Sequence, residues 1–208
     1  MAFRAEDGIT ILFGRSGSGK TTTLRAIAGI VTPDKGRVSI GEEVYFDSAA
    51  GTNLSIQKRR VGYVFQDYAL FPHMTAEQNV IYGIKETADR LRREKARALL
   101  ALFKIEHVSQ RYPQNMSGGE QQRTALARAL ASDPAVVLLD EPLSAVDTQT
   151  RSRLLDEVVS AQERVRIPFI YVTHNTAEAI RLGTQVVVLS EGSVKQMGHP
   201  SKIFENGK

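Results

Sequence analysis

Glycine, serine, lysine and threonine at fixed spacing predict an anion-binding loop near the start of the chain. Residues 14–21 read Gly-Arg-Ser-Gly-Ser-Gly-Lys-Thr, and they lie between an apolar run over 9–13 and a helix-like stretch over 22–28. Glycines let successive backbone N–H groups turn towards an anion, and the helix that follows directs its positive dipole end to the same place. This order of strand, loop and helix is a Walker A loop, which is typical of nucleoside triphosphate binding.

Within this loop the residue types divide the chemical work. The Lys20 ammonium can reach the β- and γ-phosphates of a bound nucleotide, and the Thr21 hydroxyl can ligate Mg²⁺. A glycine-rich turn that binds nothing is the alternative, and eight matched positions with suitable flanks argue against it. We expect the remaining phosphate contacts to come from Gly14, Arg15, Ser16, Gly17, Ser18, Gly19 and Thr22.

Two carboxylates follow an apolar run farther along the chain. Residues 136–139 are Val-Val-Leu-Leu, the composition of a strand buried on both faces, and Asp140 and Glu141 come directly after them. Open α/β sheets bind ligands at this carboxyl edge. Asp140 would hold the Mg²⁺ shell, while Glu141 would polarise the attacking water as general base. Many strands end in an acidic turn, so the pair owes its catalytic interpretation to the Walker A loop upstream.

A third segment combines a helix start with two glycines. Ser117 is followed three residues later by Glu120, ahead of the apolar run 125–131, which is the pattern of a capping box. Gly118 and Gly119 would weaken the first turn of a helix that needs only a cap. They leave backbone N–H groups bare at the helix N-terminus, which suits a phosphate. Capping and anion binding are compatible interpretations of this segment.

Composition bounds the class of protein without deciding its function. The chain has 208 residues, of which 42% are hydrophobic, enough for one domain with a proper core. Its formal net charge is +4, and we interpret the basic clusters at 58–60 and 90–97 as solvated faces rather than nucleic-acid contacts. It has no cysteine, which excludes disulfides and thiolate metal sites. No apolar run approaches the roughly 18–20 residues of a membrane span, and the N-terminus lacks a signal-peptide pattern, so we expect no direct membrane insertion.

Apolar patterns along the chain alternate between strand and helix. We expect an α/β fold in which a core of mostly parallel strands is interrupted by one helical subdomain. A turn at 41–43 joins two short strands, which would form a small antiparallel part. The expected strands cover 9–13, 38–40, 44–46, 60–65, 136–139, 169–173 and 185–189, and the expected helical stretches cover 22–28, 75–131 and 149–164.

Together these motifs occur in the order and spacing of a known family. From about residue 8 to its C-terminus, the chain resembles an ABC transporter nucleotide-binding domain. Segment 117–120 is the most specific feature, because it separates these ATPases from other P-loop proteins. The resemblance implies a P-loop NTPase fold, with 1–208 as a single ATP-binding domain, a helical signature subdomain at about 75–133, and ATP and Mg²⁺ as ligands. The residues that carry it are 14–21, Gln66, 117–120, 140–141, 144–147 and His174.

The same resemblance implies roles for individual residues. Two copies would face each other head to tail, so that the Walker A loop of one and residues 117–119 of the other close on the same ATP. Gln66 would sense Mg²⁺ and the attacking water and would link the site to a membrane partner. Asp147 would cross the dimer seam. His174 would contact the γ-phosphate, although a lone histidine after a strand is otherwise typical of a polar strand end.

At several positions the chain departs from the family pattern. Met116 and Glu120 stand where leucine and glutamine are usual, and Asn175 stands where aspartate follows the switch histidine. Only 13 residues precede Gly14, whereas the family has two further N-terminal strands and an aromatic residue that stacks on adenine. Phe3 lies too close to the loop to take that part. We therefore expect weakened ATP binding and poor discrimination between ATP and GTP.

The segment after the third expected strand indicates a subfamily. Residues 65–75 resemble the Q-loop region of bacterial importers for oxyanions, iron, polyamines and sugars, and the short segment 41–57 is most similar to molybdate or sulfate importers. This implies a homodimer, or a pair with a second ATPase subunit, bound to membrane permease subunits that dock near the Q-loop at the cytoplasmic face of the membrane. No nucleic-acid partner is expected. Members of this group often carry a C-terminal regulatory β-domain, which we expect to be absent here or cut from a longer protein.

Three other functions are compatible with a Walker A loop. A soluble ABC-type ATPase that works on nucleic acid or ribosomes would carry two cassettes or a coiled-coil insertion. A P-loop kinase needs a lid over its acceptor substrate and has no signature helix, and a binding-only regulator would lack Glu141. The sequence therefore predicts an ATP-hydrolysing motor subunit of a membrane importer, whose solute is selected by the permease and binding protein.

Overall fold

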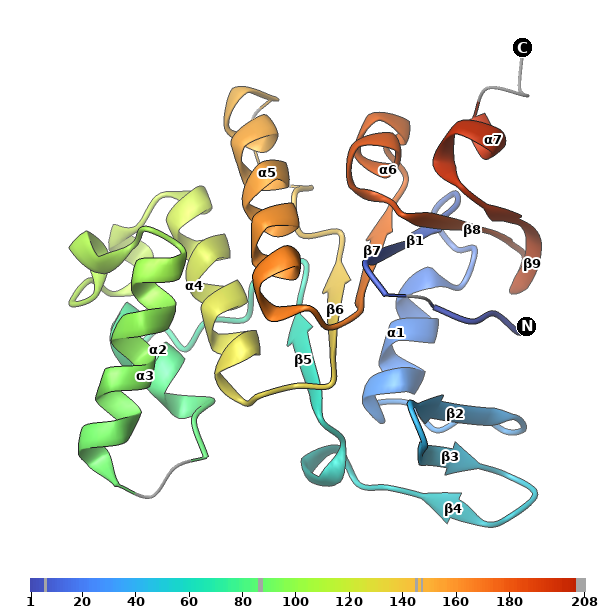
Figure 1. Cartoon of the computed structure of the whole chain (residues 1–208), viewed down its shortest axis with the longest axis horizontal. Helices are drawn as coiled ribbons and strands as arrows, with labels where there is room; N and C mark the ends of the chain where they lie inside the picture. Colours follow the sequence, from blue (N-terminus) through green and yellow to red (C-terminus); the bar gives the residue numbers. More distant parts are fainter. Residues whose placement is uncertain (6, 86–87, 145, 147, 205–208) are drawn as a thin grey trace.

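One mixed sheet organises the chain (Figure 1). The computed structural model describes residues 1–5, 7–85, 88–144, 146 and 148–204. Within this part, six strands form a sheet in the order β5-β6-β7-β1-β8-β9, in which only β9 runs antiparallel to its neighbour. The strands are β1 (Ile9–Phe13), β5 (Val61–Val64), β6 (Val136–Asp140), β7 (Phe169–Thr173), β8 (Gln185–Ser190) and β9 (Ser193–Gly198).

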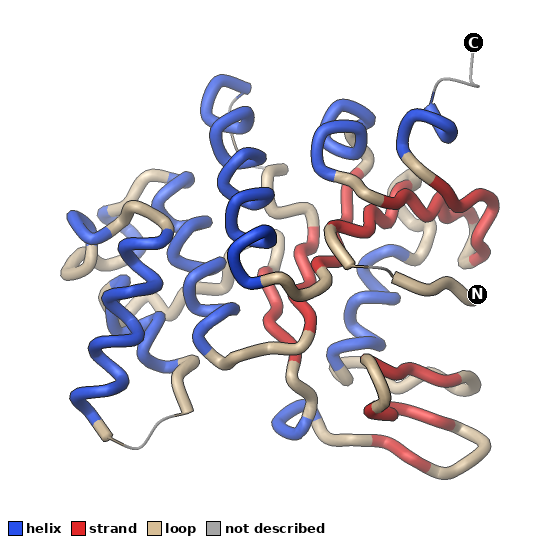
Figure 2. The backbone as a smooth tube through the Cα atoms, viewed as in Figure 1, coloured by secondary structure: helices blue, strands red, loops and turns tan. Residues whose placement is uncertain are grey.

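Helices cover both faces of this sheet, because its central strands are apolar on both sides (Figure 2). Successive side chains of a strand point to opposite faces. Val136 and Leu138 accordingly join the cluster of α1 (Lys20–Ala28), while Val137 and Leu139 join the cluster of the other face. That second face is covered by α4 (Gly118–Ala131), α5 (Thr148–Val165) and α6 (Thr176–Leu182).

A small antiparallel sheet lies beside α1 and is joined to it by a buried arginine. Its strands are β2 (Arg37–Ile40), β3 (Glu43–Asp47) and β4 (Thr52–Asn53). Arg59 is 4% exposed, and it donates to the carbonyls of Ala26 at 2.7 Å and Ile27 at 2.8 Å. The same side chain donates to the Leu54 carbonyl and to Asn53 Oδ1. It therefore bonds the C-terminal carbonyls of α1 and ties that end to the β4 segment.

Helices α2 (Ala76–Tyr82) and α3 (Asp89–Leu102) lie with α4 at one side of the sheet in Figure 1, and we call these three helices the helical lobe. Asn79, which is fully buried, bonds the backbone of Phe71 through both its amide oxygen and its amide nitrogen, and so fixes the loop that leads into the lobe. Short 3₁₀ turns and one C-terminal helix complete the description. These elements are η1 (Ile56–Lys58), η2 (Glu106–Val108), η3 (Pro113–Asn115) and the C-terminal helix α7 (Pro200–Phe204).

The predicted α/β class is confirmed, and each expected strand is present within a residue or two of its predicted ends. The expected helical stretch 75–131 is divided into three helices, because tertiary packing sets helix ends more strongly than apolar pattern does. The elements β4, β9, α6 and α7 were not predicted, and all are short or polar.

Phe3 is half-buried and packs against the cluster of α1. No helix in the described ranges is both long and apolar enough to cross a bilayer.

Candidate nucleotide site

Parallel strands bring the sequence motifs to one edge of the sheet. In the strand register Phe13 lies beside Thr173, Asp140 beside Val172, and Val64 beside Leu139. The segments that leave these strands therefore start at neighbouring points of the carboxyl edge, where α/β sheets bind ligands. They carry the predicted loop 14–21, Gln66, Glu141 and His174.

The Walker A segment wraps around the head of its own lysine. Lys20 is 4% exposed, and its Nζ donates to the carbonyls of Gly14 at 2.7 Å and Arg15 at 2.9 Å. Gly14 permits a close approach, because a Cβ there would lie 2.3 Å from the Leu189 carbonyl oxygen. The loop thus presents an ammonium within a tight backbone turn at the start of α1, the arrangement that suits a phosphate.

Two further features of the loop fit an anion. Gly17 and Gly19 have φ of 80° and 99°, conformations that favour glycine, and no side chain caps α1 at Gly19. Ser18 Oγ is buried and has no hydrogen-bond partner within the described chain. A buried hydroxyl without a partner is uncommon and calls for a ligand or water, so the residues present fit a bound phosphate. Arg15, Ser16 and Thr22 are exposed around this loop.

Asp140 is held from two sides at the same edge. Thr21 Oγ1 donates to Asp140 Oδ1 at 2.8 Å, and the Tyr63 hydroxyl donates to Asp140 Oδ2 at 3.1 Å. Burial raises the pKa of Tyr63, and the neighbouring Asp140 raises it further, so the phenol stays protonated and remains a donor. Tyr63 was not predicted from sequence. Its only signal was its place in β5, on the side of the sheet that α1 covers.

The described residues contain no cluster of three or more His, Cys, Asp or Glu side chains that could hold a metal. A site with one carboxylate and one hydroxyl suits Mg²⁺, which keeps several waters and takes further oxygen ligands from substrate phosphates. Asp140 and Thr21 are hard oxygen donors in contact with each other beside the phosphate loop. The residues at this edge therefore fit a magnesium–nucleotide complex.

Glu141 and His174 come together at the ends of β6 and β7. His174 Nδ1 lies 3.3 Å from Glu141 Oε2, and the histidine side chain is 66% exposed. Glu141 has a φ of 44°, although its backbone N–H still donates to the Val172 carbonyl. A non-glycine residue held in this conformation is uncommon and recurs at functional sites. The pair can therefore act as a base and an adjacent imidazole at the same sheet edge as the phosphate loop.

Asn175 fixes the turn after His174, whereas Gln66 lies at an exposed position. Asn175 caps α6, since its Oδ1 accepts from the backbone of Ala177 at 2.9 Å, and it thereby fixes the chain directly after the histidine. Gln66 is exposed just beyond β5. Asp147, predicted to cross a dimer seam, lies outside the described residues.

Segment 117–120 forms the predicted capping box at the start of α4. Glu120 Oε2 accepts from the Ser117 backbone N–H at 2.7 Å, and Ser117 Oγ accepts from the Glu120 N–H. His107 lies 3.0 Å from the other Glu120 oxygen. Burial acts to raise the pKa of Glu120, but the Ser117 and His107 hydrogen bonds outweigh it, so the net shift is downward. The capping interpretation is confirmed.

The two glycines of this segment are not demanded by packing within the chain. A Cβ on Gly118 would meet no described atom within 4 Å, and one on Gly119 would meet its nearest, Thr150 Cγ2, at an ordinary 3.5 Å. Among the described residues no hydrogen bond joins 117–119 to the Walker A loop. The described part of the chain therefore leaves the helix start open at Gly118, while Gly119 is buried.

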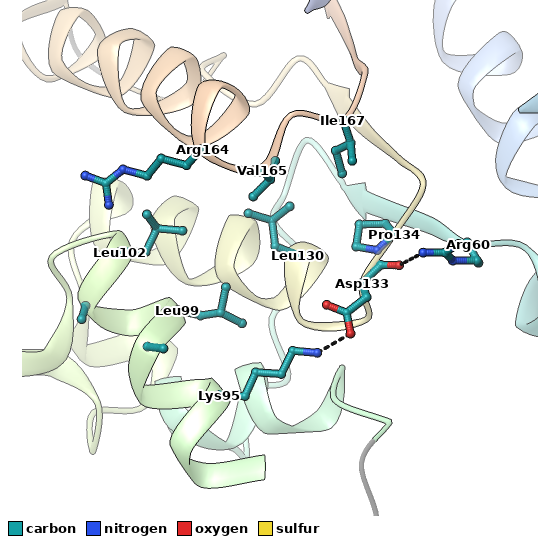
Figure 3. Close-up of a pocket in the computed structure, with 12 residues that line it drawn as sticks. Arg60, Lys95, Leu99, Leu102, Leu130, Asp133, Pro134, Arg164, Val165 and Ile167 are labelled. Atoms are coloured by element: carbon teal, nitrogen blue, oxygen red, sulfur yellow. Dashed lines mark hydrogen bonds and ion pairs between the residues drawn. The ribbon is translucent and has the colours of Figure 1, made fainter. Parts of the chain in front are cut away.

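A cavity of about 680 Å³ lies away from these motifs, between the helical lobe and the end of α5 (Figure 3). Leu99, Leu130 and Ile167 line it. Two of its charged side chains contact Asp133, because Lys95 pairs with the Asp133 carboxylate and Arg60 donates to the Asp133 carbonyl at 3.0 Å. We therefore place the candidate site at the Walker A edge, where the phosphate loop, the Thr21–Asp140 pair and the Glu141–His174 pair meet.

Comparison with known proteins decides the family. Residues 4–144 match the family model described as ABC transporter. The chain belongs to the ABC transporter family. Its match to that family covers the Walker A loop, the capping-box segment and both carboxylates after β6.

Curated relatives carry a more specific description. The chain is 44% identical over 202 residues to the molybdenum import ATP-binding protein ModC of Brucella melitensis, and 42% identical over 196 residues to ModC of Vibrio parahaemolyticus. These alignments cover 97% and 94% of this chain, but 56% and 52% of the relatives. The chain thus spans about half the length of the curated relatives it matches.

Solved structures support the same fold. Clostridium perfringens cbiO1, part of the ABC transporter complex cbiONQ, has a TM-score of 0.85 at 27% identity, with 98% of this chain and 82% of that chain covered. The ATP-binding cassette MJ0796, in a dimeric post-hydrolysis state bound to ADP and Pi, has a TM-score of 0.77 at 28% identity, with 95% and 88% covered. The fold of this chain is that of an ABC cassette.

Proposed function

We propose that this chain is the ATP-hydrolysing motor of an ABC importer that takes up molybdate or a similar oxyanion. The observation that carries the proposal is the meeting, at one sheet edge, of the lysine-centred phosphate loop, the Thr21–Asp140 pair and the Glu141–His174 pair. Relatives named molybdenum import ATP-binding proteins support the choice of transport and of substrate class.

Each residue has a task in hydrolysis. Lys20 and the backbone N–H groups of the loop would bind the β- and γ-phosphates, and Thr21 and Asp140, with Gln66, would hold Mg²⁺. That ion supplies charge neutralisation of the phosphate oxygens when it is bound. Glu141 would accept a proton from the attacking water, whose oxygen bonds to the γ-phosphorus as the bond to the β-phosphate oxygen breaks, giving ADP and phosphate. His174, beside Glu141, would orient the base and contact the γ-phosphate.

We propose further that residues 1–208 act as one ATP-binding domain and pair head to tail with a second ATPase copy. The exposed position of Gly118, where a Cβ would meet no described atom within 4 Å, supports a trans contact, because backbone N–H groups at the start of α4 suit the phosphates of a partner's nucleotide. Asp147 would lie at the seam between the copies. Permease subunits would dock near Gln66 and the helical lobe, with the motor peripheral at the cytoplasmic face of the membrane.

Replacement of Glu141 by Gln tests the catalytic part of this proposal. The amide keeps the size of the side chain but cannot take a proton, so ATP hydrolysis should fall by about 10²–10⁴-fold while nucleotide binding is kept. Phosphate release and binding of a fluorescent ATP analogue would be measured on the same preparations. Turnover within a few-fold of the wild-type rate would reject Glu141 as the base.

A further inference from the structure

The turn that follows Gln66 is held in an unfavourable backbone conformation. Tyr68 and Ala69 have φ of 61° and 43°, so two consecutive residues with a Cβ occupy the left-handed region. Such residues are disfavoured because Cβ crowds the following carbonyl oxygen. The Tyr68 side chain is 5% exposed and its hydroxyl has no partner among the described atoms, which adds a second unfavourable feature to the same turn.

An arginine from the signature helix holds this turn. Arg128, on α4, donates through Nη2 to the Tyr68 carbonyl at 2.8 Å and through Nη1 to the Ala69 carbonyl at 2.7 Å. Its guanidinium also lies 5.3 Å from the centre of the Phe71 ring. The two short hydrogen bonds fall on the two left-handed residues themselves. The guanidinium therefore binds the carbonyls of both residues that hold the unfavourable conformation.

Arg128 meets these carbonyls in place of a carboxylate. No described Asp or Glu forms an ion pair with it, and burial lowers the pKa of its guanidinium. A half-buried cation is stabilised here by carbonyl dipoles and an aromatic face. The fork of two guanidinium N–H groups fits two adjacent carbonyls, whereas a lysine ammonium is a single point of charge. The forked shape of the Arg128 guanidinium therefore matters as well as its positive charge.

We propose that Arg128 is a positioning residue that holds the turn at Tyr68 and Ala69 and thereby sets the place of Gln66. Gln66 lies two residues before this turn, and the Tyr68 N–H bonds the Phe65 carbonyl directly ahead of Gln66. Arg128 lies on the same helix whose first residues follow Ser117. A displacement of α4 is thus transmitted to the Gln66 turn through two hydrogen bonds. This inference rests on the proposed function only for the role given to Gln66.

Two substitutions separate positioning from general stability. Arg128→Lys keeps the charge but removes the fork, and we expect the ATPase kcat to fall roughly tenfold with the Kd for Mg·ATP within about threefold. Ala69→Gly in the Arg128→Lys background should restore most of the rate, because glycine adopts a φ of 43° without the Cβ penalty. Arg123→Lys is the matched control, since Arg123 lies on the same helix and pairs with Glu157 at 3.1 Å.

Hydrogen exchange gives a readout that requires no nucleotide. In Arg128→Lys the amides of 66–70 should exchange faster than in wild type while those of α4 stay protected, and Ala69→Gly should reverse the change. The proposal is overturned if the Arg128→Lys and Arg123→Lys chains behave alike, or if folded Arg128→Lys/Ala69→Gly stays as impaired as Arg128→Lys. Failure of the wild-type chain to bind Mg·ATP would instead reject the proposed function and leave the exchange test valid.

Discussion

Asp140 shows how a single carboxylate is prepared by residues far apart in the chain. Thr21 and Tyr63 donate to its two oxygens from α1 and β5, and Asp140 as a residue is 6% exposed. Thr21 was predicted because the Walker A spacing defines it. Tyr63 and Arg128 could not be predicted, because their roles arise from strand order and helix packing that no local pattern encodes.

Replacement of Tyr63 by Phe should weaken magnesium-dependent nucleotide binding. A hydrogen bond to a charged group is worth about 1.5–3 kcal/mol, so its loss, with the bond from Thr21 kept, corresponds to roughly tenfold or more. We expect the Mg²⁺ concentration for half-maximal ATP binding to rise by that factor in a Glu141→Gln background, as followed by fluorescence. Tyr171→Phe is the control, because the Tyr171 hydroxyl donates to the buried Glu178 at the same 3.1 Å. Equal shifts for the two variants, or none, would refute the role of Tyr63.

Helix α1 is an element whose start fits a phosphate and whose end is supported by residues from another segment. Gly29 ends it in a left-handed conformation, and Arg59 then binds the carbonyls of Ala26 and Ile27. A Cβ on Gly29 would lie 2.8 Å from the Arg59 guanidinium, so the two residues fit only as a pair. The sequence predicted the helix and the small sheet, but not this link, since Arg59 was interpreted as part of a solvated basic cluster. Its burial corrects that interpretation.

Arg59→Met should destabilise the fold substantially. The change leaves several buried carbonyls without donors, and a cost of about 2–4 kcal/mol follows from the loss of charged hydrogen bonds. Arg60→Met is the matched control, because the Arg60 side chain is exposed and its one hydrogen bond among the described residues goes to the Asp133 carbonyl. Urea unfolding would measure both. A cost for Arg59→Met no larger than that of the control would show that the link between α1 and the small sheet contributes little.

Across the whole molecule, burial raises the pKa of four tyrosines, namely Tyr45, Tyr63, Tyr68 and Tyr171. Tyrosine in the unfolded chain ionises near pH 10, whereas these phenols remain protonated in the folded state to higher pH. Their contribution to stability is therefore complete below about pH 10 and is lost as the pH rises above it. We expect the free energy of unfolding, measured in urea, to fall from pH 10 to 11, and to fall less steeply in Tyr171→Phe. A constant stability over that range would contradict the burial of these phenols.

In the proposed function a second copy covers the site and completes the motor. Size-exclusion chromatography with light scattering of the Glu141→Gln chain, with and without Mg·ATP, tests this directly. We predict a dimer of twice the 22.9 kDa chain mass with Mg·ATP and a monomer without it. Ser117→Arg in the same background should stay monomeric while still binding ATP. A Glu141→Gln chain that binds Mg·ATP but remains monomeric at every concentration, or dimers that form equally well with Ser117→Arg, would contradict the proposed head-to-tail site.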